Sequence, residues 1–458
     1  MQHLSCKLLI IGAGPGGYVC GIRAGQLGID TVVVEGGSPG GTCLNVGCIP
    51  SKALIHAAQE FDTVKHAGSE NALGISAGSA TIDLGKTVDW KNSVVAKLTG
   101  GVAGLLKKSG VRVVRGYAQI RDGKSVVVDT DKGPLLIRCQ HLVLATGSAP
   151  VELPFLPFGD RVISSTEALD LRTVPNHLAV IGAGYIGLEI GMAMAKLGAR
   201  VTLVEAERNI LSQYDAPLTR PVMARLQDLG IQVRLEARAK GMTDTGNLLV
   251  ETPEGSEEIP ADKVLVTVGR RPVLDGFGVE DLGLDRDGPF LHINDICATS
   301  MRDVYAIGDI TGEPMLAHRA IAQGTLVAEH LAGHRVRWDK RAIPAVCFTD
   351  PEIVTVGQGP AQVKGAKVSL FPFQANGRAL TMERSDGFVR IVSDPATGLV
   401  LGIQAVGQGV SEMAGEFGLA IEMAATLADI AGTIHAHPTL GETTQEAALM
   451  GLGAALHI

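Results

Sequence analysis

An internal repeat constrains this sequence more than any other feature. Residues 8–35 read LLIIGAGPGGYVCGIRAGQLGIDTVVVE, and residues 178–205 read LAVIGAGYIGLEIGMAMAKLGARVTLVE. Each copy has a short apolar run, a G-x-G-x-x-G sequence, a helical stretch and a second apolar run that ends in glutamate. The last glycine of the motif and this glutamate are 18 residues apart in both copies. The repeat predicts two β-α-β nucleotide-binding units in one chain.

The first unit contains Gly12, Gly14 and Gly17 and ends at Glu35. Glycine permits a tight turn and a close approach of the backbone to a pyrophosphate, which then faces the unpaired N–H groups of the following helix. The Glu35 carboxylate can accept hydrogen bonds from a ribose. A glycine motif alone is weak evidence, because the chain has 58 glycines and an ordinary strand–turn–helix also fits. The flanking strand and helix, and the distance to Glu35, favour a dinucleotide site.

The second unit contains Gly182, Gly184 and Gly187 and ends at Glu205. A carboxylate at this position suits a free ribose 2′-hydroxyl and repels a 2′-phosphate, so we expect NAD rather than NADP. Two dinucleotide sites in one chain indicate electron transfer between two cofactors, because a simple dehydrogenase needs only one.

The rest of the chain adds elements to both units and then changes in texture. Residues 83–108 have a helical pattern, and residues 111–137 alternate in the manner of strands separated by Gly and Asp turns. Buried strands that end in glycine occur at 141–147 and 264–269, and from residue 343 strands alternate with helices without a glycine motif. We therefore predict an α/β fold with two Rossmann-like domains and a C-terminal α+β domain.

Charge and composition exclude several classes of protein. The formal net charge is −8 and no run rich in Lys and Arg occurs, so the electrostatic footprint of a nucleic-acid binder is absent. No stretch of about 18 uncharged apolar residues predicts a membrane span. The chain enters a strand at residues 7–11 without a secretory pattern before it. The seven cysteines are odd in number and scattered, which is not a disulfide framework and suits a reducing, cytoplasmic location.

One close cysteine pair, Cys43 and Cys48, follows the first unit. In an ideal helix residues five apart have Cα atoms roughly 8–9 Å apart, whereas a disulfide tolerates at most about 7 Å. If the pair forms a bond, the segment cannot be regular helix, and Gly47 and Pro50 fit a distorted first turn. Such a bond is readily reduced and suits catalysis. Two free core cysteines remain an alternative; a metal site is less favoured, because no second Cys/His pair has ligand spacing.

Four further polar residues are candidates on weaker grounds. His437 and Glu442 lie close together near the C-terminus, and a carboxylate can hold a histidine in one tautomer as a base for thiol chemistry. A surface turn with incidental histidines explains the same residues equally well. Asp309 follows a strand-like run and can bind ribityl or ribose hydroxyls, although an Asp-initiated turn is the simpler explanation. His318 is either a ligand or a helix cap.

Seven motifs in this order make the chain resemble a known family: GAGPGG, GGTCLNVGCIPSK, ATG, GAGYIGLE, GRRP, YAIGD and HAHPTLGE. The chain resembles the class I pyridine nucleotide-disulfide oxidoreductases, and within them the branch of dihydrolipoamide dehydrogenases. The resemblance covers nearly the whole chain, and GGTC-x4-C-x-PSK is its most specific motif.

The resemblance implies two cofactors and four segments. It implies FAD on the first unit, at Gly12, Gly14, Gly17, Glu35, Gly41, Thr42, Lys52, Ala118, Thr146, Gly147, Asp309 and Ala317. It implies NAD on the second unit, at Gly182, Gly184, Tyr185, Ile186, Gly187, Glu189, Glu205 and Gly269. The expected segments are an FAD domain (1–148), an NAD domain (149–271), a central segment that completes the FAD domain (272–342) and a dimerisation domain (343–458).

The resemblance also implies how the site works. Cys43 exchanges with a dihydrolipoyl thiol, Cys48 lies nearer the flavin, and Lys52 pairs with Glu189. His437, oriented by Glu442, takes the substrate proton. In a homodimer His437 and Glu442 of one subunit face the cysteines of the other, and the substrate arrives on a lipoyl domain of an acyltransferase or of a glycine-cleavage carrier protein.

Two departures and several rivals bear on this interpretation. Val273 replaces the family's usual Asn after GRRP, and Tyr185 stands where several relatives have a smaller residue, which makes a gating role a hypothesis. A glutathione-reductase-type enzyme is the alternative, but Glu205 opposes NADP. Mercuric reductase and large thioredoxin reductase need C-terminal cysteines, and none follows Cys347. Soluble transhydrogenase lacks the cysteine pair, and a non-catalytic flavoprotein scaffold does not explain why the pair is retained.

Overall fold

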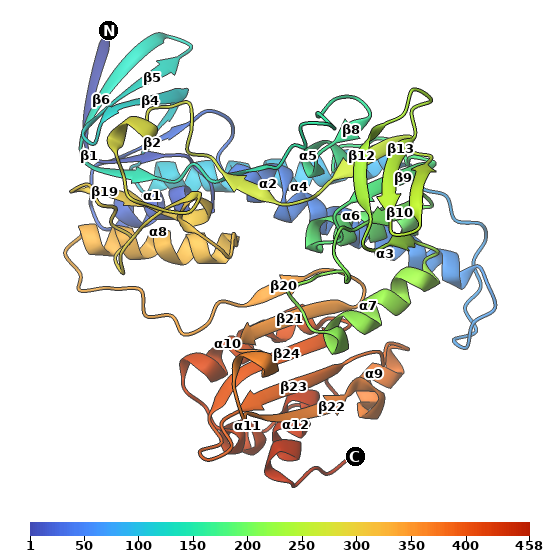
Figure 1. The fold of residues 1–458 in the computed structure, drawn as a ribbon. Helices are drawn as coiled ribbons and strands as arrows, with labels where there is room; N and C mark the ends of the chain where they lie inside the picture. The colour runs from blue at the N-terminus through green and yellow to red at the C-terminus, as the bar shows by residue number, and fades with distance from the viewer.

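The computed structural model describes residues 1–458. In Figure 1 the two sheets that contain parallel strands lie side by side in the upper part, and the antiparallel sheet formed by the C-terminal residues, called the third sheet below, lies beneath them. The long helices α3 (Cys48–Ala67) and α4 (Leu84–Lys108) extend between the two upper sheets. Asp83 caps α4 by accepting a hydrogen bond from the Lys86 amide, as expected for a helix that starts at this acid.

The first sheet contains the first predicted unit. Its strand order is β3-β2-β1-β6-β5-β4, with β19 beside β6. The strands are β1 (Gln2–Ile11), β2 (Thr31–Glu35), β3 (Arg112–Arg115), β4 (Tyr117–Asp122), β5 (Ser125–Thr130), β6 (Gly133–Leu144) and β19 (Val304–Ala306). β1 is parallel to β2 and β6, whereas β4 and β5 form the antiparallel meander. The chain therefore returns to this sheet at β19, after the second unit.

The helices of the first unit follow from the apolar character of its strands. Leu8, Leu9 and Ile10 of β1 are fully buried, so both faces of the sheet must be covered. Helix α1 (Pro15–Gln26) packs against α8 (Ala317–Leu331) on one face. β1 begins at Gln2, which is earlier than the predicted start at residue 7.

The second sheet repeats the arrangement, with strand order β11-β10-β9-β15-β8 and all pairs parallel. Its strands are β8 (Val162–Ile163), β9 (His177–Ile181), β10 (Arg200–Val204), β11 (Gln232–Arg234) and β15 (Lys263–Val266). The meander is β12 (Arg238–Met242), β13 (Leu248–Thr252) and β14 (Gly255–Ile259). The helices are α5 (Ser165–Ala168), α6 (Tyr185–Lys196) and α7 (Ala216–Asp228).

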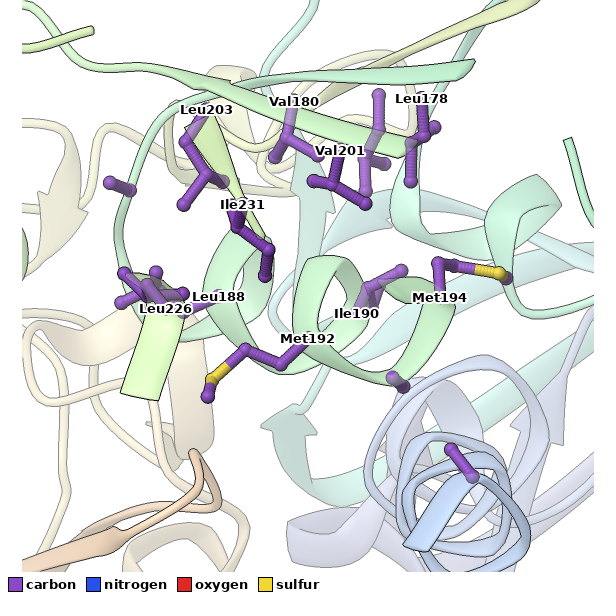
Figure 2. Close-up of a cluster of buried hydrophobic side chains, with 14 of the residues drawn as sticks. Leu178, Val180, Leu188, Ile190, Met192, Met194, Val201, Leu203, Leu226 and Ile231 are labelled. Atoms are coloured by element: carbon purple, nitrogen blue, oxygen red, sulfur yellow. The ribbon is translucent and has the colours of Figure 1, made fainter. Parts of the chain in front are cut away.

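Helix α6 is buried on nearly all sides. Figure 2 shows Val180 of β9 and Val201 and Leu203 of β10 pointing toward the helix that carries Leu188 and Ile190. A buried, almost uniformly apolar helix leaves few places for charge, and the two charged side chains of α6 are also buried, at Glu189 and Lys196. Both therefore need partners from other elements.

The internal repeat is confirmed by the two glycine turns. Gly12 and Gly182 have φ values of +99° and +98°, which favour glycine. A Cβ added to Gly17 would lie 1.9 Å from the Gly12 oxygen, and one on Gly187 would lie 2.1 Å from the Gly182 oxygen. The third glycine of each motif therefore lets the helix pack against its own turn.

The third sheet is antiparallel, with strand order β20-β21-β24-β23-β22. Its strands are β20 (Ala345–Cys347), β21 (Glu352–Gly357), β22 (Lys367–Pro372), β23 (Phe388–Ser393) and β24 (Val400–Gly407). The helices α9 (Gly377–Thr381), α10 (Ala414–Glu422), α11 (Leu427–Gly432) and α12 (Glu442–Leu452) accompany it. The predicted α+β region after residue 343 is confirmed.

Short elements complete the chain: β7 (Ser148–Pro150) pairs with β16 (Arg270–Pro272), and β17 (Arg286–Asp287) pairs with β18 (Phe290–Leu291). The β7–β16 pair joins the segment after β6 of the first sheet to the segment after β15 of the second sheet. No helix has both the length and the apolar character needed to cross a membrane.

Candidate active site

A break in a helix separates the two cysteines. Helix α2 (Gly41–Val46) contains Cys43, and α3 begins at Cys48. Gly47 lies between them with φ −137° and ψ −108°, far from helical values. The segment is thus not one regular helix, which is the condition that a bond between the two cysteines would require. Both cysteines are thiols in the structure, which is the reduced form of the pair.

The two sulfurs are electrostatically different. A hydrogen bond from the Cys43 thiol to the Cys48 sulfur lowers the pKa of Cys48 to about 7, and Lys52 adds to this effect against the opposing effect of burial. The same hydrogen bond, together with burial, raises the pKa of Cys43 well above its ordinary value. Near neutral pH a substantial share of Cys48 is therefore thiolate, beside a neutral Cys43 thiol.

Lys52 is held beside Cys48 by two elements that are distant in sequence. Its Nζ lies 2.8 Å from a carboxylate oxygen of Glu189 on α6 and 4.3 Å from the centre of the Phe348 ring. The other Glu189 oxygen accepts a hydrogen bond of 2.9 Å from the Phe348 amide. Lys52 and Glu189 thus form the pair that the family resemblance implies.

A cavity of about 480 Å³ extends from the cysteines along the first glycine turn. Eleven of the twelve expected FAD residues line it, namely Gly12, Gly14, Glu35, Gly41, Thr42, Lys52, Ala118, Thr146, Gly147, Asp309 and Ala317. Gly17 does not, because it lies behind the turn and packs against Gly12. Glu189 also lines this first cavity, although the sequence grouped it with the NAD residues.

The first cavity fits an elongated dinucleotide. Gly14 is the N-cap residue of α1 and provides no side-chain cap, so the first N–H groups of the helix are free to face a pyrophosphate. A Cβ on Gly41 would lie 2.6 Å from the Gly14 Cα, which means that only glycine fits this close approach. Glu35 accepts hydrogen bonds from the Ala13 and Gly37 amides at 2.7 and 2.8 Å, and these fix its carboxylate for a ribose. These features suit FAD.

The second cavity, of about 1100 Å³, lies along the second glycine turn. Gly182, Gly184, Tyr185, Ile186, Glu205 and Gly269 line it, whereas Gly187 lies behind the turn. Glu205 accepts hydrogen bonds from the Ala183 and Glu207 amides at 2.6 and 2.9 Å, in the same pattern as Glu35. The fixed carboxylate suits the unphosphorylated ribose of NAD.

Four residues line both cavities: Tyr185, Ile186, Arg270 and Met315. Tyr185 therefore lies where a gate between the two sites would have to be, and burial raises its pKa to about 12, so it remains a neutral phenol. Sequence reasoning did not assign Arg270 or Met315. Arg270 belongs to the GRRP motif, and that motif was the available signal.

A serine that sequence reasoning also missed, Ser148, connects Arg270 to Asp309 in the first cavity. The Arg270 guanidinium donates hydrogen bonds of 2.8 Å to both the Oγ and the carbonyl oxygen of Ser148. The Ser148 hydroxyl in turn donates to the Asp309 carboxylate. Thr146 donates to the backbone carbonyl of Val273, so the departure from the family's Asn leaves this backbone contact in place.

His437 lies in the loop between α11 and α12. Its Nδ1 is 2.8 Å from Glu442, whose other oxygen accepts a hydrogen bond of 2.8 Å from the Thr439 amide. Burial raises the pKa of Glu442, but the Thr439 amide and His437 outweigh this effect and hold the pKa below its ordinary value. The imidazole is 80% exposed. His318, the other candidate, binds only the Pro344 carbonyl.

The His437 loop and the cysteines lie apart within one chain. Figure 1 shows α11 and α12 beneath the third sheet, whereas α2 lies above that sheet between the two upper ones. One chain therefore does not bring His437 to Cys43 and Cys48, and a site that contains all three needs residues from a second chain.

Comparison with known proteins agrees with this geometry. Residues 6–324 match the family model of pyridine nucleotide-disulphide oxidoreductases, and residues 343–448 match the model of that family's dimerisation domain. The chain belongs to the pyridine nucleotide-disulphide oxidoreductases. It is an oxidoreductase whose cofactors are FAD and NAD.

The individual relatives are full-length matches. A dihydrolipoyl dehydrogenase of Pseudomonas aeruginosa is 56% identical over 462 residues, which cover 100% of both chains. One of Geobacillus stearothermophilus is 45% identical and covers 99% of this chain and 98% of its own. The crystal structure of LpdA from Mycobacterium tuberculosis superposes with a TM-score of 0.89 at 27% identity, covering 98% of this chain and 99% of that one.

Proposed function

We propose that this protein oxidises protein-bound dihydrolipoamide to lipoamide and reduces NAD⁺ to NADH. The observation that carries the proposal is the unequal cysteine pair, a Cys48 thiolate beside a neutral Cys43 thiol, on the cavity that fits FAD. The full-length similarity to dihydrolipoyl dehydrogenases supports this substrate over glutathione. The fixed Glu205 carboxylate supports NAD.

The cysteine pair receives two electrons from the substrate dithiol. In the oxidised enzyme a substrate thiolate attacks the Cys43 sulfur, the Cys43–Cys48 bond breaks, and Cys48 leaves as a thiolate that Lys52 stabilises. The second substrate thiol then attacks the sulfur bound to Cys43, which closes the lipoyl disulfide and releases Cys43, and the proton of that thiol passes to Cys43 to give its neutral form. The residues of the first cavity, among them Glu35 and Asp309, would hold FAD, which when bound would supply the redox chemistry that links the reduced cysteines to NAD⁺.

The substrate proton goes to His437. Because Glu442 accepts from Nδ1, the neutral imidazole carries its proton on that nitrogen and leaves Nε2 free to accept a proton from a thiol. The ionised Glu442 carboxylate then stabilises the imidazolium that forms. The exposed imidazole can reach a substrate that is not buried in its own chain.

The active unit in this proposal is a homodimer with two shared sites. The family's dimerisation domain supports it, as do exposed apolar side chains around the His437 loop, at Leu419, Met423, Ile434 and Leu456. Ile434 is 95% exposed in the single chain. The partner that delivers the substrate is the lipoyl domain of an acyltransferase or of a glycine-cleavage carrier, in the cytoplasm. The proposal divides the chain into an FAD domain (1–148), an NAD domain (149–271), a central segment that completes the FAD domain (272–342) and a dimerisation domain (343–458).

Rapid mixing of the holoenzyme with dihydrolipoamide tests the function. We expect a long-wavelength absorption band from the Cys48 thiolate beside the flavin, followed by turnover with NAD⁺ but not with NADP⁺. Absence of the band, or efficient reduction of oxidised glutathione with NADPH, would contradict the proposal. Capture of lipoylated proteins from cell extract on the holoenzyme then identifies the complex that it serves.

A further inference from the structure

Two polar contacts join α3 to α6 with the same spacing on both helices. In the near contact, Lys52 of α3 binds Glu189 of α6 at 2.8 Å. In the remote contact, Gln59 of α3 accepts a hydrogen bond of 2.6 Å from Lys196 of α6. Each residue of the remote contact lies seven positions further along its helix, or about two turns. The helices therefore run in the same direction with a fixed register.

The loop between β20 and β21 contacts the same two positions. The Phe348 amide donates to Glu189, which extends the near contact. The Asp350 carboxylate lies 2.7 Å from the Lys196 ammonium and extends the remote contact. One segment of the third domain is thus fastened to α6 at both places where α6 is fastened to α3.

Lys196 of the remote contact also belongs to a buried ionic cluster around Asp350. Asp350 also binds Arg225 of α7 at 3.0 Å and Arg384, while Arg225 reaches Asp62 of α3 at 3.0 Å. Lys196 is only 4% exposed and Asp350 only 9%. Burial raises the pKa of Asp350, but the three cations outweigh this effect and hold the pKa well below its ordinary value.

A buried cluster of this kind permits little movement. Removing one partner leaves the others as uncompensated buried charges, so displacement of the helices is costly. Arg225 connects α3 to α7 and to the third domain at once, through Asp62 and Asp350. The remote contact therefore fixes α3 against both neighbouring domains.

We propose that Lys196 and Asp350 are positioning residues that keep Glu189 of α6 within reach of Lys52 and so hold the Lys52 side chain beside Cys48. Cys48 and Lys52 both belong to α3, one turn apart, so the register of α3 against α6 does not change their backbone separation. It sets whether Glu189 meets the Lys52 side chain and fixes its direction. Buried apolar side chains of α3 and α6 also pack together, and the two polar contacts add a defined register to that packing. This inference rests on the role proposed above for Lys52 and Cys48.

The electrostatic consequence is specific to one thiol. Five titratable side chains interact electrostatically with the Cys48 thiol. They are Tyr18 on α1, Cys43 on α2, Lys52 on α3, and Tyr185 and Glu189 on α6. Only Lys52 is a cation. A displacement of its charge by about 1 Å shifts the pKa of Cys48 upward by about half a unit, on the effective dielectric typical of such sites.

The experiment measures how fast iodoacetamide modifies Cys48 in the reduced holoenzyme as a function of pH. Tandem mass spectrometry separates the Cys48 product from that of Cys43. We expect Lys196→Met and Asp350→Asn to raise the midpoint by about half a pH unit, and Lys196→Arg to restore the wild-type value. The assay does not require turnover with any substrate.

Arg390→Met is the matched control. Arg390 is also buried and forms an ion pair of 2.7 Å with Asp215, at the start of α7, but it forms no hydrogen bond or ion pair with α3 or α6. It should lower thermal stability without moving the midpoint. If Lys196→Met and Asp350→Asn behave like Arg390→Met, the positioning proposal is overturned. If wild-type Cys48 shows no midpoint near neutrality, the proposed function itself loses its support.

Discussion

At the scale of single residues, the site depends on pairs in which one member tunes the other. Cys43 acts on Cys48 through a hydrogen bond, and Lys52 acts on the same sulfur through its charge. Glu442 acts on His437 by holding its Nδ1. In each pair the chemistry belongs to one side chain and its reactivity is set by the other.

Replacing Glu442 by Gln tests the second pair. The amide oxygen of the new glutamine can still accept a hydrogen bond from Nδ1 of His437, but the negative charge that stabilises the imidazolium is gone. Because the pKa of Glu442 is held below its ordinary value, this charge is present throughout the neutral range. We expect kcat with dihydrolipoamide to fall by about 10²-fold, with little change in the KM for NAD⁺.

The chain offers a closely matched control on the same helix. Glu446 of α12 pairs with His457 at 2.6 Å, which is a carboxylate–imidazole pair without a role in the proposed chemistry. Glu446→Gln should leave kcat unchanged. Equal losses in the two variants would mean that Glu442 stabilises α12 rather than the imidazolium.

At the scale of elements, glycines decide where helices can begin. The third glycine of the first motif, Gly17, allows α1 to touch its own turn, since a Cβ would lie 1.9 Å from the Gly12 oxygen. Gly47 interrupts the α2–α3 segment and leaves Cys43 and Cys48 on separate helices. Both features place backbone N–H groups or sulfurs at the edge of the first cavity.

Alanine at two glycines should have opposite effects. Gly17→Ala forces α1 away from the turn, so we expect loss of FAD retention on gel filtration and a lower melting temperature. Gly100 lies within α4 with open space around its Cα, and Gly100→Ala should raise stability by roughly 0.5–1 kcal/mol through helix propensity. If Gly17→Ala binds FAD normally, close packing at this turn is not required.

The sequence was sufficient for features that are local and periodic. The two glycine turns, the strands beside them, α4 after Asp83 and the helix break between the cysteines all follow from spacing within about 30 residues. Contacts between distant elements leave no such pattern. Lys196 meets Asp350 and Arg270 meets Ser148 only because the chain folds, and nothing near either residue indicates its partner.

The site illustrates the same limit. The family resemblance supplied Lys52 with Glu189, and the structure brings them together. It did not supply Arg270 or Met315, which lie where the two cavities meet. Their position depends on how the second unit stands against the first, and this is set by the β7–β16 pair and by the buried cluster around Asp350.

At the scale of the whole molecule, the third domain has two functions. Its Phe348–Asp350 segment fastens α6 from the same chain. Its far side carries the exposed His437 beside exposed apolar side chains such as Ile434. In the proposed mechanism one side therefore completes the site of its own chain, and the other presents the base His437 to the cysteines of a second chain.

Mixed dimers test whether the base comes from the second chain. We expect Cys43→Ser and His437→Gln homodimers to be inactive. In a dimer with one chain of each kind, a shared arrangement gives one site with both changes and one with neither, so about half of the wild-type activity returns. If each site is built from one chain, both sites carry a change and the mixed dimer is inactive.

Pairing a wild-type chain with a Cys43→Ser/His437→Gln chain reverses the outcome. Shared sites then each carry one change and are inactive, whereas sites built within one chain leave half of the activity. Two affinity tags allow both mixed dimers to be isolated and assayed with dihydrolipoamide and NAD⁺. The assay distinguishes the two arrangements, because each arrangement predicts activity in only one of the two mixed dimers.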